Sequence, residues 1–252
     1  MSATTRLGLP EEILACLFDL DGVLTETAKV HAAAWKEIFD VFLHDRATMS
    51  GGDFVAFDDK NDYATYVDGK TRLEGTRSFL ASRQITLPEG SPSDAEGMET
   101  VNGLSNAKNA IVTRRIREEG VNAYPGSLTY LGEVRSAGLH RAVVSSSANC
   151  VEVLKAAGIS EFFEARIDGT TVIQQHLAGK PSPDTFLAAA QILDTSPKQC
   201  AVFEDALAGV EAGRAGGFGF VVGVDRVGQA AELHIHGADV VVTDLSQLLQ
   251  TP

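Results

Sequence analysis

The stretch LFDLDGVLTETAKVHAAAW, residues 17–35, decides the fold of this chain. It starts as an apolar run, places Asp19 and Asp21 two residues apart, passes Gly22 and then takes a helical pattern. A short apolar run of this kind is typical of a buried strand in a parallel sheet. Two neighbouring carboxylates repel each other and cost free energy to desolvate. We therefore expect the strand to end at a site where other groups compensate both aspartates.

Similar apolar runs recur after residue 120. They are HRAVVSSS (140–147), QCAVFEDA (199–206), GFGFVVGVD (217–225) and ADVVVTDL (238–245), and helical patterns lie between them. Nearly continuous apolar strands that alternate with helices predict an α/β fold, with a Rossmann-like parallel sheet covered by helices on both faces.

A different pattern fills the chain between the first strand and residue 120. Helical patterns replace the β-branched runs, and the irregular stretch GGDFVAFDDKNDYATYVDGKTRLEG (51–75) interrupts them. We therefore expect two domains. Residues 1–29 and 121–252 would form the core, and residues 30–120 would form a helical cap inserted after the first strand.

Composition restricts the class of protein. Of the 252 residues 44% are hydrophobic and 22% are charged, an ordinary globular mixture. The net charge of −13 disfavours general binding to nucleic acid or anionic membranes. Cys16, Cys150 and Cys200 have no CxxC spacing, which favours a reducing compartment over a disulfide framework. With no apolar run of membrane-spanning length and no apolar signal-peptide region at the N-terminus, we expect a soluble cytoplasmic protein. We also expect a monomer whose partner is a small molecule.

Polar side chains follow the predicted strands at the edge where open parallel sheets bind ligands. They are Asp19 and Asp21, Ser145, Ser146 and Ser147, and Glu204 and Asp205, and a loop adds Lys180. Clustered carboxylates need a cation, and oxygen ligands without Cys or His favour Mg²⁺. A lysine and a serine-rich helix start are suited to hold a phosphate. One aspartate is then available as a nucleophile, Asp19, and the other as a general acid and base, Asp21.

Four motifs carry a resemblance to a known family. FDLDGVLTET, VVSSSAN, GKPSPD and FEDALAG resemble, in this order, the four motifs of the haloacid dehalogenase-like phosphotransferase superfamily, and the expected cap stands where that superfamily has one. DGVLTETAKVHAAAWK, and AKNAIVTRRI followed by YPG, are most similar to its β-phosphoglucomutase branch. The resemblance implies Mg²⁺-dependent interconversion of β-glucose 1-phosphate and glucose 6-phosphate through a phosphorylated Asp19 and a bisphosphate intermediate, with a cap that closes over the sugar. A sugar-phosphate phosphatase and a non-catalytic sugar-phosphate sensor stay open as alternatives.

The same resemblance implies a role for each matching residue. The Mg²⁺ ligands would be the Asp19 carboxylate, the Asp21 main-chain carbonyl, Glu204 and Asp205. Ser145 and Lys180 would hold the transferring phosphate. Substrate would also be bound by Ser146, Ser147 and Asn149, by Thr27 and His31 at the hinge into the cap, and by Gly75, Thr76, Arg77, Ser78 and Lys108 of the cap.

The chain departs from the mutase pattern at several positions. Glu26 stands where the branch has Asp, and Ala148 stands where it has a lysine. The cap arginine, Arg77, is out of register. The insert from Phe54 to Leu73 is longer than expected for the branch, so Lys70 and Arg72 are rival candidates for the distal phosphate of the substrate. His31, one helical turn before Trp35, is as consistent with a structural role as with a hinge role.

Overall fold

The computed structural model describes residues 2–250 and contains two compact units. The sheet unit comprises Met1–Thr27 and Val121–Pro252, and the helical unit comprises Ala28–Gly120. Of the helices within residues 2–250, none combines the length and the apolar composition that crossing a bilayer requires.

The sheet unit is built on six parallel strands in the order β3-β2-β1-β4-β5-β6. The strands are β1 (Ala15–Phe18), β2 (His140–Val144), β3 (Ala165–Ile167), β4 (Cys200–Glu204), β5 (Phe220–Val224) and β6 (Val240–Val242). β1 lies between β2 and β4, with Leu17 opposite both Ala142 and Val202. Because the strands are parallel, the carboxyl ends of β1, β2 and β4 meet at one edge, where the motif residues follow.

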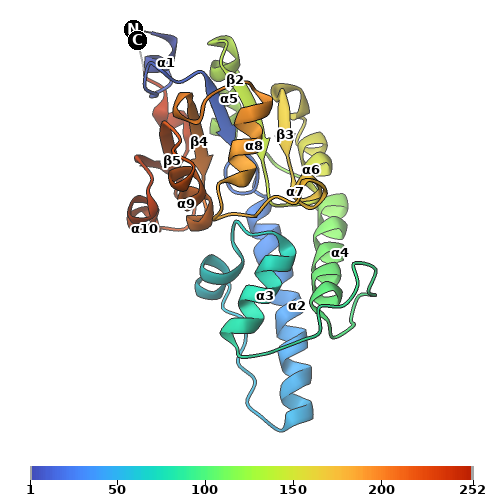
Figure 1. Ribbon diagram of the computed structural model, residues 1–252. Coiled ribbons are helices and arrows are strands. Elements are labelled where there is room, and N and C mark those ends of the chain that lie inside the picture. The colour runs from blue at the N-terminus through green and yellow to red at the C-terminus, as the bar shows by residue number, and fades with distance from the viewer. Residues whose placement is uncertain (1, 251–252) are drawn as a thin grey trace. The chain divides into compact units, whose positions relative to one another are not determined.

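Helices cover both faces of this sheet, which confirms the predicted α/β fold (Figure 1). Leu17 lies in an apolar cluster with Phe186 of α8 on one face. The next side chain, Phe18, lies on the other face. Its ring stacks on that of Phe203, with 4.4 Å between the ring centres, and meets the ring of Tyr130 of α5 edge-on, with 6.4 Å between the centres. Every residue of β1 and β4 is buried, so neither strand shows an alternation of polar and apolar residues.

The helices of the sheet unit are mostly short. They are α1 (Ala3–Arg6), α5 (Pro125–Ser136), α6 (Cys150–Ala156), α7 (Gly169–Gln175), α8 (Asp184–Ile192), α9 (Leu207–Ala215) and α10 (Ala230–His236), with 3₁₀ turns at η2 (Ser160–Phe162), η3 (Pro197–Gln199) and η4 (Leu245–Leu248).

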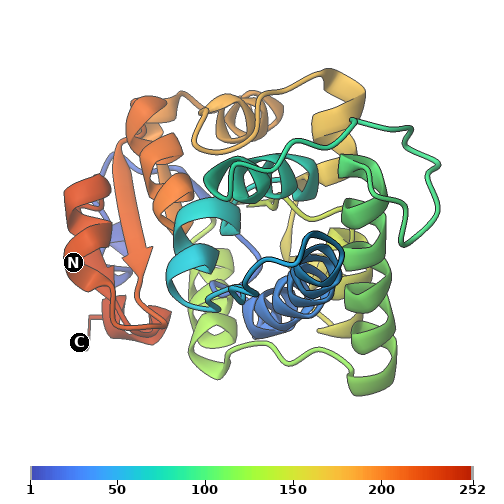
Figure 2. The ribbon, with the colours of Figure 1, turned by 90° about the horizontal axis from the view of Figure 1, so that it is seen from below.

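The helical unit packs around an aromatic core. Its elements are α2 (Thr27–Ser50), which begins in the sheet unit, the π-helical turn η1 (Tyr63–Val67), α3 (Arg72–Ser82) and α4 (Val101–Glu119). Figure 2 views α2 along its axis, with η1, α3 and α4 around it (blue, cyan, teal and green). The Phe39 ring of α2 lies 5.0 Å from the Trp35 ring and 4.1 Å from the Phe79 ring of α3, measured between ring centres. Phe57 of the irregular segment packs against the same cluster.

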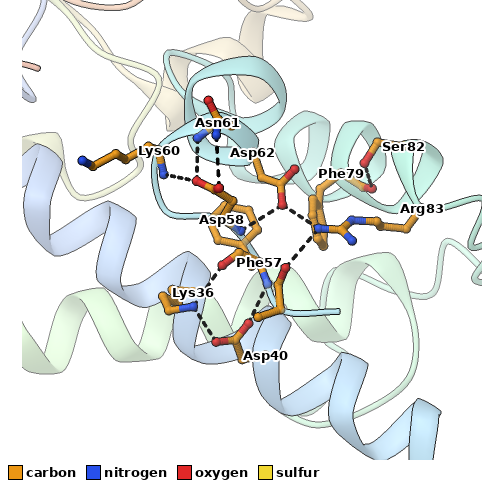
Figure 3. A network of polar contacts seen from close by, with 11 residues as sticks. Lys36, Asp40, Phe57, Asp58, Lys60, Asn61, Asp62, Phe79, Ser82 and Arg83 are labelled. Atoms are coloured by element: carbon orange, nitrogen blue, oxygen red, sulfur yellow. Dashed lines mark hydrogen bonds and ion pairs between the residues drawn. The ribbon is translucent and has the colours of Figure 1, made fainter. Parts of the chain in front are cut away.

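Polar contacts hold that irregular segment against α2 and α3 (Figure 3). Asp40 of α2 accepts hydrogen bonds from the Phe57 amide and from Lys36, both at 2.8 Å. Lys36 also donates to the Phe57 carbonyl at 2.9 Å. Arg83, at the end of α3, pairs with Asp62 at 2.6 Å, and both side chains are largely buried. The segment therefore has a defined conformation although it has little regular secondary structure.

We predict that Asp62→Ala lowers the free energy of unfolding by roughly 2 kcal/mol, because a charge-assisted bond between partly buried groups is lost. Urea denaturation measures the change. The matched control is Glu89→Ala, since Glu89 and its partner Arg77 are 53% and 47% exposed, and solvent limits such a pair to less than about 1 kcal/mol. Equal losses in both variants would contradict the prediction.

Candidate active site

Asp19 and Asp21 follow β1 on a tight loop. Asp19 continues the sheet ladder by donating its amide to the Phe203 carbonyl at 2.9 Å, and its side chain is buried. Gly22 then takes a positive φ of 85°, and its amide donates to the Thr25 carbonyl at 2.8 Å. A Cβ at Gly22 would overlap the carboxylate of Asp205, so only glycine lets this loop approach the end of β4.

Lys180 lies buried between two carboxylates. Its Nζ is 2.5 Å from Oδ1 of Asp19 and 2.5 Å from Oε1 of Glu204, and it donates to the Val144 carbonyl at 3.0 Å. Burial alone would lower the pKa of Lys180, but the two carboxylates outweigh burial and raise it. Burial raises the pKa of Asp19 well above its usual value, although Lys180 opposes that shift. Lys180 therefore stays charged, and the cluster around it still lacks positive charge.

The remaining negative charge makes this cluster a candidate cation site. Asp19, Glu204 and Asp205, all buried, each place a carboxylate oxygen within 4.8 Å of the others. Three carboxylates face one lysine, so a divalent cation would balance the charge. Because the side-chain donors are all oxygens, the residues present fit a hard cation such as Mg²⁺.

A glycine of α9 sets the position of Glu204. The Glu204 carboxylate accepts from the Ala206 amide at 3.2 Å and lies against Gly209. A Cβ at Gly209 would overlap that carboxylate. The glycine of FEDALAG therefore provides the space in which the buried Glu204 reaches Lys180.

Asp21 is held by hydroxyl groups. Thr27 donates to Oδ1 of Asp21, and the Thr27 hydroxyl is itself 2.7 Å from that of Thr25. Ser145, at the end of β2, makes a long contact of 3.5 Å to Oδ2 of Asp21. The structure thus brings Thr27, which the sequence predicts at the hinge into the cap, and Ser145 to the side chain of Asp21.

The serine loop after β2 is largely self-supporting. Ser145 accepts from the Ser147 amide at 3.1 Å, and the Ser147 hydroxyl accepts from the Asn149 amide at 3.2 Å. Ser145 and Asn149 are buried, whereas Ser146 and Ser147 are partly exposed. The side chains of Ser146 and Ser147 are thus accessible to a substrate.

Two residues without a motif also reach this edge of the sheet. Arg226 donates to the Gly22 carbonyl at 2.7 Å, and Gln229 donates to the Asp205 carbonyl at 2.9 Å. Their one sequence signal is that they follow β5, whose carboxyl end lies at the same edge as those of β1 and β4. Neither residue belongs to one of the four motifs.

The predicted substrate residues of the helical unit fall into a buried group and a set of partly or fully exposed cations. Lys108 is 5% exposed, with Nζ 2.8 Å from Nδ1 of His31 and 4.8 Å from the centre of the Trp35 ring. The Thr76 hydroxyl is 2.9 Å from that of Ser105, and both residues are fully buried. His31 and Lys108 thus lie together, and Thr76 has a packing role. Gly75 is also buried, and a Cβ added there would lie 3.2 Å from the Trp35 ring and 3.4 Å from Val67.

The three candidate cations differ in what they contact. Arg77 pairs with Glu89, which raises the pKa of Arg77. Lys70 donates to the Ser78 hydroxyl at 3.0 Å. Within residues 2–250 the Arg72 guanidinium has no hydrogen bond or ion pair, and its partial burial lowers its pKa. Arg72 is therefore the cation whose charge the described chain leaves uncompensated.

Comparisons with known proteins point to one family. The profile of the haloacid dehalogenase-like hydrolases matches residues 13–217. A β-phosphoglucomutase of Mycobacterium tuberculosis is 56% identical to this chain, and the match covers 96% of this chain and 94% of that protein. A β-phosphoglucomutase of Bacillus subtilis is 33% identical, and the match covers 93% of this chain and 91% of that protein. The crystal structure of a β-phosphoglucomutase from Clostridium difficile superposes with a TM-score of 0.71 and 29% identity, covering 94% of this chain and 93% of that one.

We predict that Mg²⁺ stabilises the folded protein, and that Gly209→Ala abolishes this stabilisation because it displaces Glu204. In the unchanged protein, a hundredfold excess of Mg²⁺ over its Kd should raise Tm by about 5–10 °C. The matched control is Gly132→Ala in α5, where a Cβ meets no atom within 4 Å, so the Mg²⁺ response should stay unchanged. A full Mg²⁺ shift in Gly209→Ala would show that Glu204 has no part in cation binding.

Proposed function

The chain belongs to the haloacid dehalogenase-like hydrolase family, and from this membership we propose that it interconverts β-glucose 1-phosphate and glucose 6-phosphate with the help of Mg²⁺. The observation that carries the chemistry is Lys180 buried between Asp19 and Glu204, with Asp205 beside them. The similarity to β-phosphoglucomutases along nearly the whole chain supports the choice of substrate.

The first half of the reaction would form an aspartyl-phosphate. A carboxylate oxygen of Asp19 attacks the phosphorus of the donor, the bond between phosphorus and the sugar oxygen breaks, and Asp21 gives that oxygen its proton. Lys180 holds Oδ1 of Asp19 and so orients the attacking group. Bound at Asp19, Glu204, Asp205 and the Asp21 carbonyl, Mg²⁺ would offset the repulsion between carboxylate and phosphate.

The second half would transfer the phosphoryl group from Asp19 to the free hydroxyl of a sugar monophosphate, which yields the sugar bisphosphate as the intermediate between the two isomers. Asp21, now ionised, takes the proton of that hydroxyl as its oxygen attacks the phosphorus, and the Asp19 oxygen leaves. Thr27 fixes the rotation of the Asp21 carboxylate by donating to Oδ1. Ser145 and the following serines supply hydroxyl and amide donors for the phosphate oxygens.

A mutase also needs a group for the phosphate that does not react. We propose Arg72 for this task, in preference to Arg77 and Lys70. Arg77 is already paired with Glu89 and Lys70 with Ser78, whereas the partly buried Arg72 guanidinium has no partner within residues 2–250. A guanidinium binds phosphate through two parallel hydrogen bonds, which suits a dianionic group. Gly75 and Thr76 would support this site by packing, and Lys108 with His31 would contribute polar contacts to the sugar.

A phosphatase with the same residues is the second candidate. Water would then replace the sugar hydroxyl in the second half of the reaction, and Asp21 would activate it. The catalytic groups do not distinguish the two activities, because both need the aspartyl-phosphate. They differ in whether a second phosphate is bound.

We further propose that the enzyme acts in the cytoplasm as a monomer on a small sugar phosphate, without nucleic acid or a membrane. Cys16, Cys150 and Cys200 are free and buried, which is consistent with a reducing compartment.

Phosphorus NMR of the enzyme with Mg²⁺, β-glucose 1-phosphate and a catalytic amount of glucose 1,6-bisphosphate tests the proposal. We expect glucose 6-phosphate to accumulate, and Asp21→Ala to slow it by about 10²–10⁴-fold. Inorganic phosphate as the main product would identify a phosphatase. Binding without any turnover would support a sensor, and near-full activity of Asp21→Ala would overturn the mechanism.

The distal phosphate site has its own test. We predict that Arg72→Met lowers kcat/KM for β-glucose 1-phosphate by roughly 10–100-fold, since a charge-assisted bond to phosphate is lost. Hydrolysis of p-nitrophenyl phosphate, which has a single phosphate, should change little. Arg77→Met is the matched control and should stay within about threefold, as expected for a solvent-exposed ion pair. The opposite ranking of the two variants would assign the distal phosphate to Arg77.

A further inference from the structure

Arg226 joins three segments of the sheet unit. It follows β5, and its side chain is 16% exposed. Its guanidinium donates to the Gly22 carbonyl at 2.7 Å, to the Val23 carbonyl at 3.3 Å and to the Thr243 carbonyl at 2.6 Å. The first two acceptors belong to the loop after β1, and the third belongs to the loop after β6.

The same guanidinium stacks on Tyr124, where the chain has returned to the sheet unit. The guanidinium carbon lies 3.6 Å from the centre of the Tyr124 ring. The Tyr124 amide donates to the Leu24 carbonyl at 3.0 Å, so this residue is also tied to the loop after β1. Arg226 therefore has a planar contact on one face and three carbonyls at its edge, an arrangement that only arginine provides.

Of the two carbonyls in the loop after β1 that accept from Arg226, that of Gly22 accepts the shorter hydrogen bond. Gly22 is next to the predicted acid/base, Asp21. Gly22 is bonded covalently to Asp21 and lies directly against the carboxylate of Asp205. A displacement of Gly22 would thus shift Asp21 relative to Asp19, which the sheet ladder and Lys180 hold independently.

The turn that carries Arg226 is itself rigid. The Asp225 carboxylate accepts from the amides of Val227, Gly228 and Gln229 at 3.1, 2.6 and 2.9 Å. Gln229 then donates to the Asp205 carbonyl at 2.9 Å. One turn, residues 225–229, therefore contacts both the loop after β1 and the loop after β4.

We propose that Arg226 is a positioning residue for proton transfer by Asp21, acting through the Gly22 and Val23 carbonyls. The inference rests on the proposed aspartyl-phosphate chemistry, but it holds equally for the mutase and for the phosphatase. Loss of Arg226 leaves the attacking group and Lys180 in place and releases the loop that aims Asp21.

The test compares two phosphate esters whose leaving groups differ. The p-nitrophenolate anion is stable and leaves without a proton, whereas the alkoxide of glucose 6-phosphate needs one from Asp21. The constant kcat/KM reports the steps up to the release of the first product, here the sugar or the p-nitrophenolate. Hydrolysis of the aspartyl-phosphate comes later and does not affect kcat/KM. The ratio of the two kcat/KM values is also independent of the fraction of enzyme that is folded.

In Arg226→Met we expect kcat/KM for glucose 6-phosphate to fall by roughly 10–100-fold, and that for p-nitrophenyl phosphate by no more than about threefold. Arg226→Lys should recover part of the loss, because an ammonium reaches one carbonyl but not all three. If Arg226→Met does not fold, Arg226→Lys and Arg226→Gln are compared in the same way.

The matched control is Arg214→Met, which removes another arginine of the sheet unit that pairs with an acid, Asp239, at 3.0 Å. We expect both kcat/KM values of this variant to equal those of the unchanged enzyme. An equal fall for both substrates in every Arg226 variant, or no fall, would overturn the inference. If the unchanged enzyme neither hydrolyses an ester nor isomerises β-glucose 1-phosphate in the phosphorus NMR assay, the proposed function fails instead, so the two failures are distinguishable.

Discussion

The buried contact of Lys180 with Asp19 and Glu204 is the interaction on which the site depends. Each of the three groups would be costly to bury alone, and none is compensated by its own strand or loop. They come from three separate segments, so their charges balance only when β1, β4 and the loop before α8 are assembled. The compensation is incomplete, because one lysine faces two carboxylates and Asp205 adds a third. That deficit of positive charge is what makes the cluster suitable for a cation and a phosphate.

Close approach of main chain and carboxylate is the second constraint. Gly22 and Gly209 each lie where a Cβ would overlap an acidic side chain of the site. Both glycines belong to the motifs that surround the charged residues, so the motifs encode the space for each carboxylate as well as the carboxylate itself. A polar loop without chemistry would not need that space. The pattern of charge and glycine together is therefore a better guide to function than the pair of aspartates alone.

Different interactions determine the structure of the helical unit. Its core is aromatic, and ion pairs such as that of Asp62 with Arg83 determine the path of its irregular segment. The sequence does not distinguish Lys70, Arg72 and Arg77 as ligands for the distal phosphate, because all three are cations on a helix or just before one. The structure distinguishes them, since two have partners and the third, Arg72, has none within residues 2–250. The choice of partner depends on which acidic side chain lies nearby, and sequence spacing does not specify that.

The sequence by itself determined the α/β fold, the central place of the first strand and the meeting of Asp19, Asp21, Lys180, Glu204 and Asp205. Those followed from buried strand runs, and from the rule that parallel strands present their carboxyl ends at one edge. Only the tertiary structure decided the insertion of Lys180 between two acids and the contact of Arg226 with Gly22, 204 residues apart in the chain. A guanidinium that binds main-chain carbonyls leaves no pattern in the acceptor residues, because every residue has a carbonyl. Such contacts exist only once the loops after β1, β5 and β6 are folded side by side.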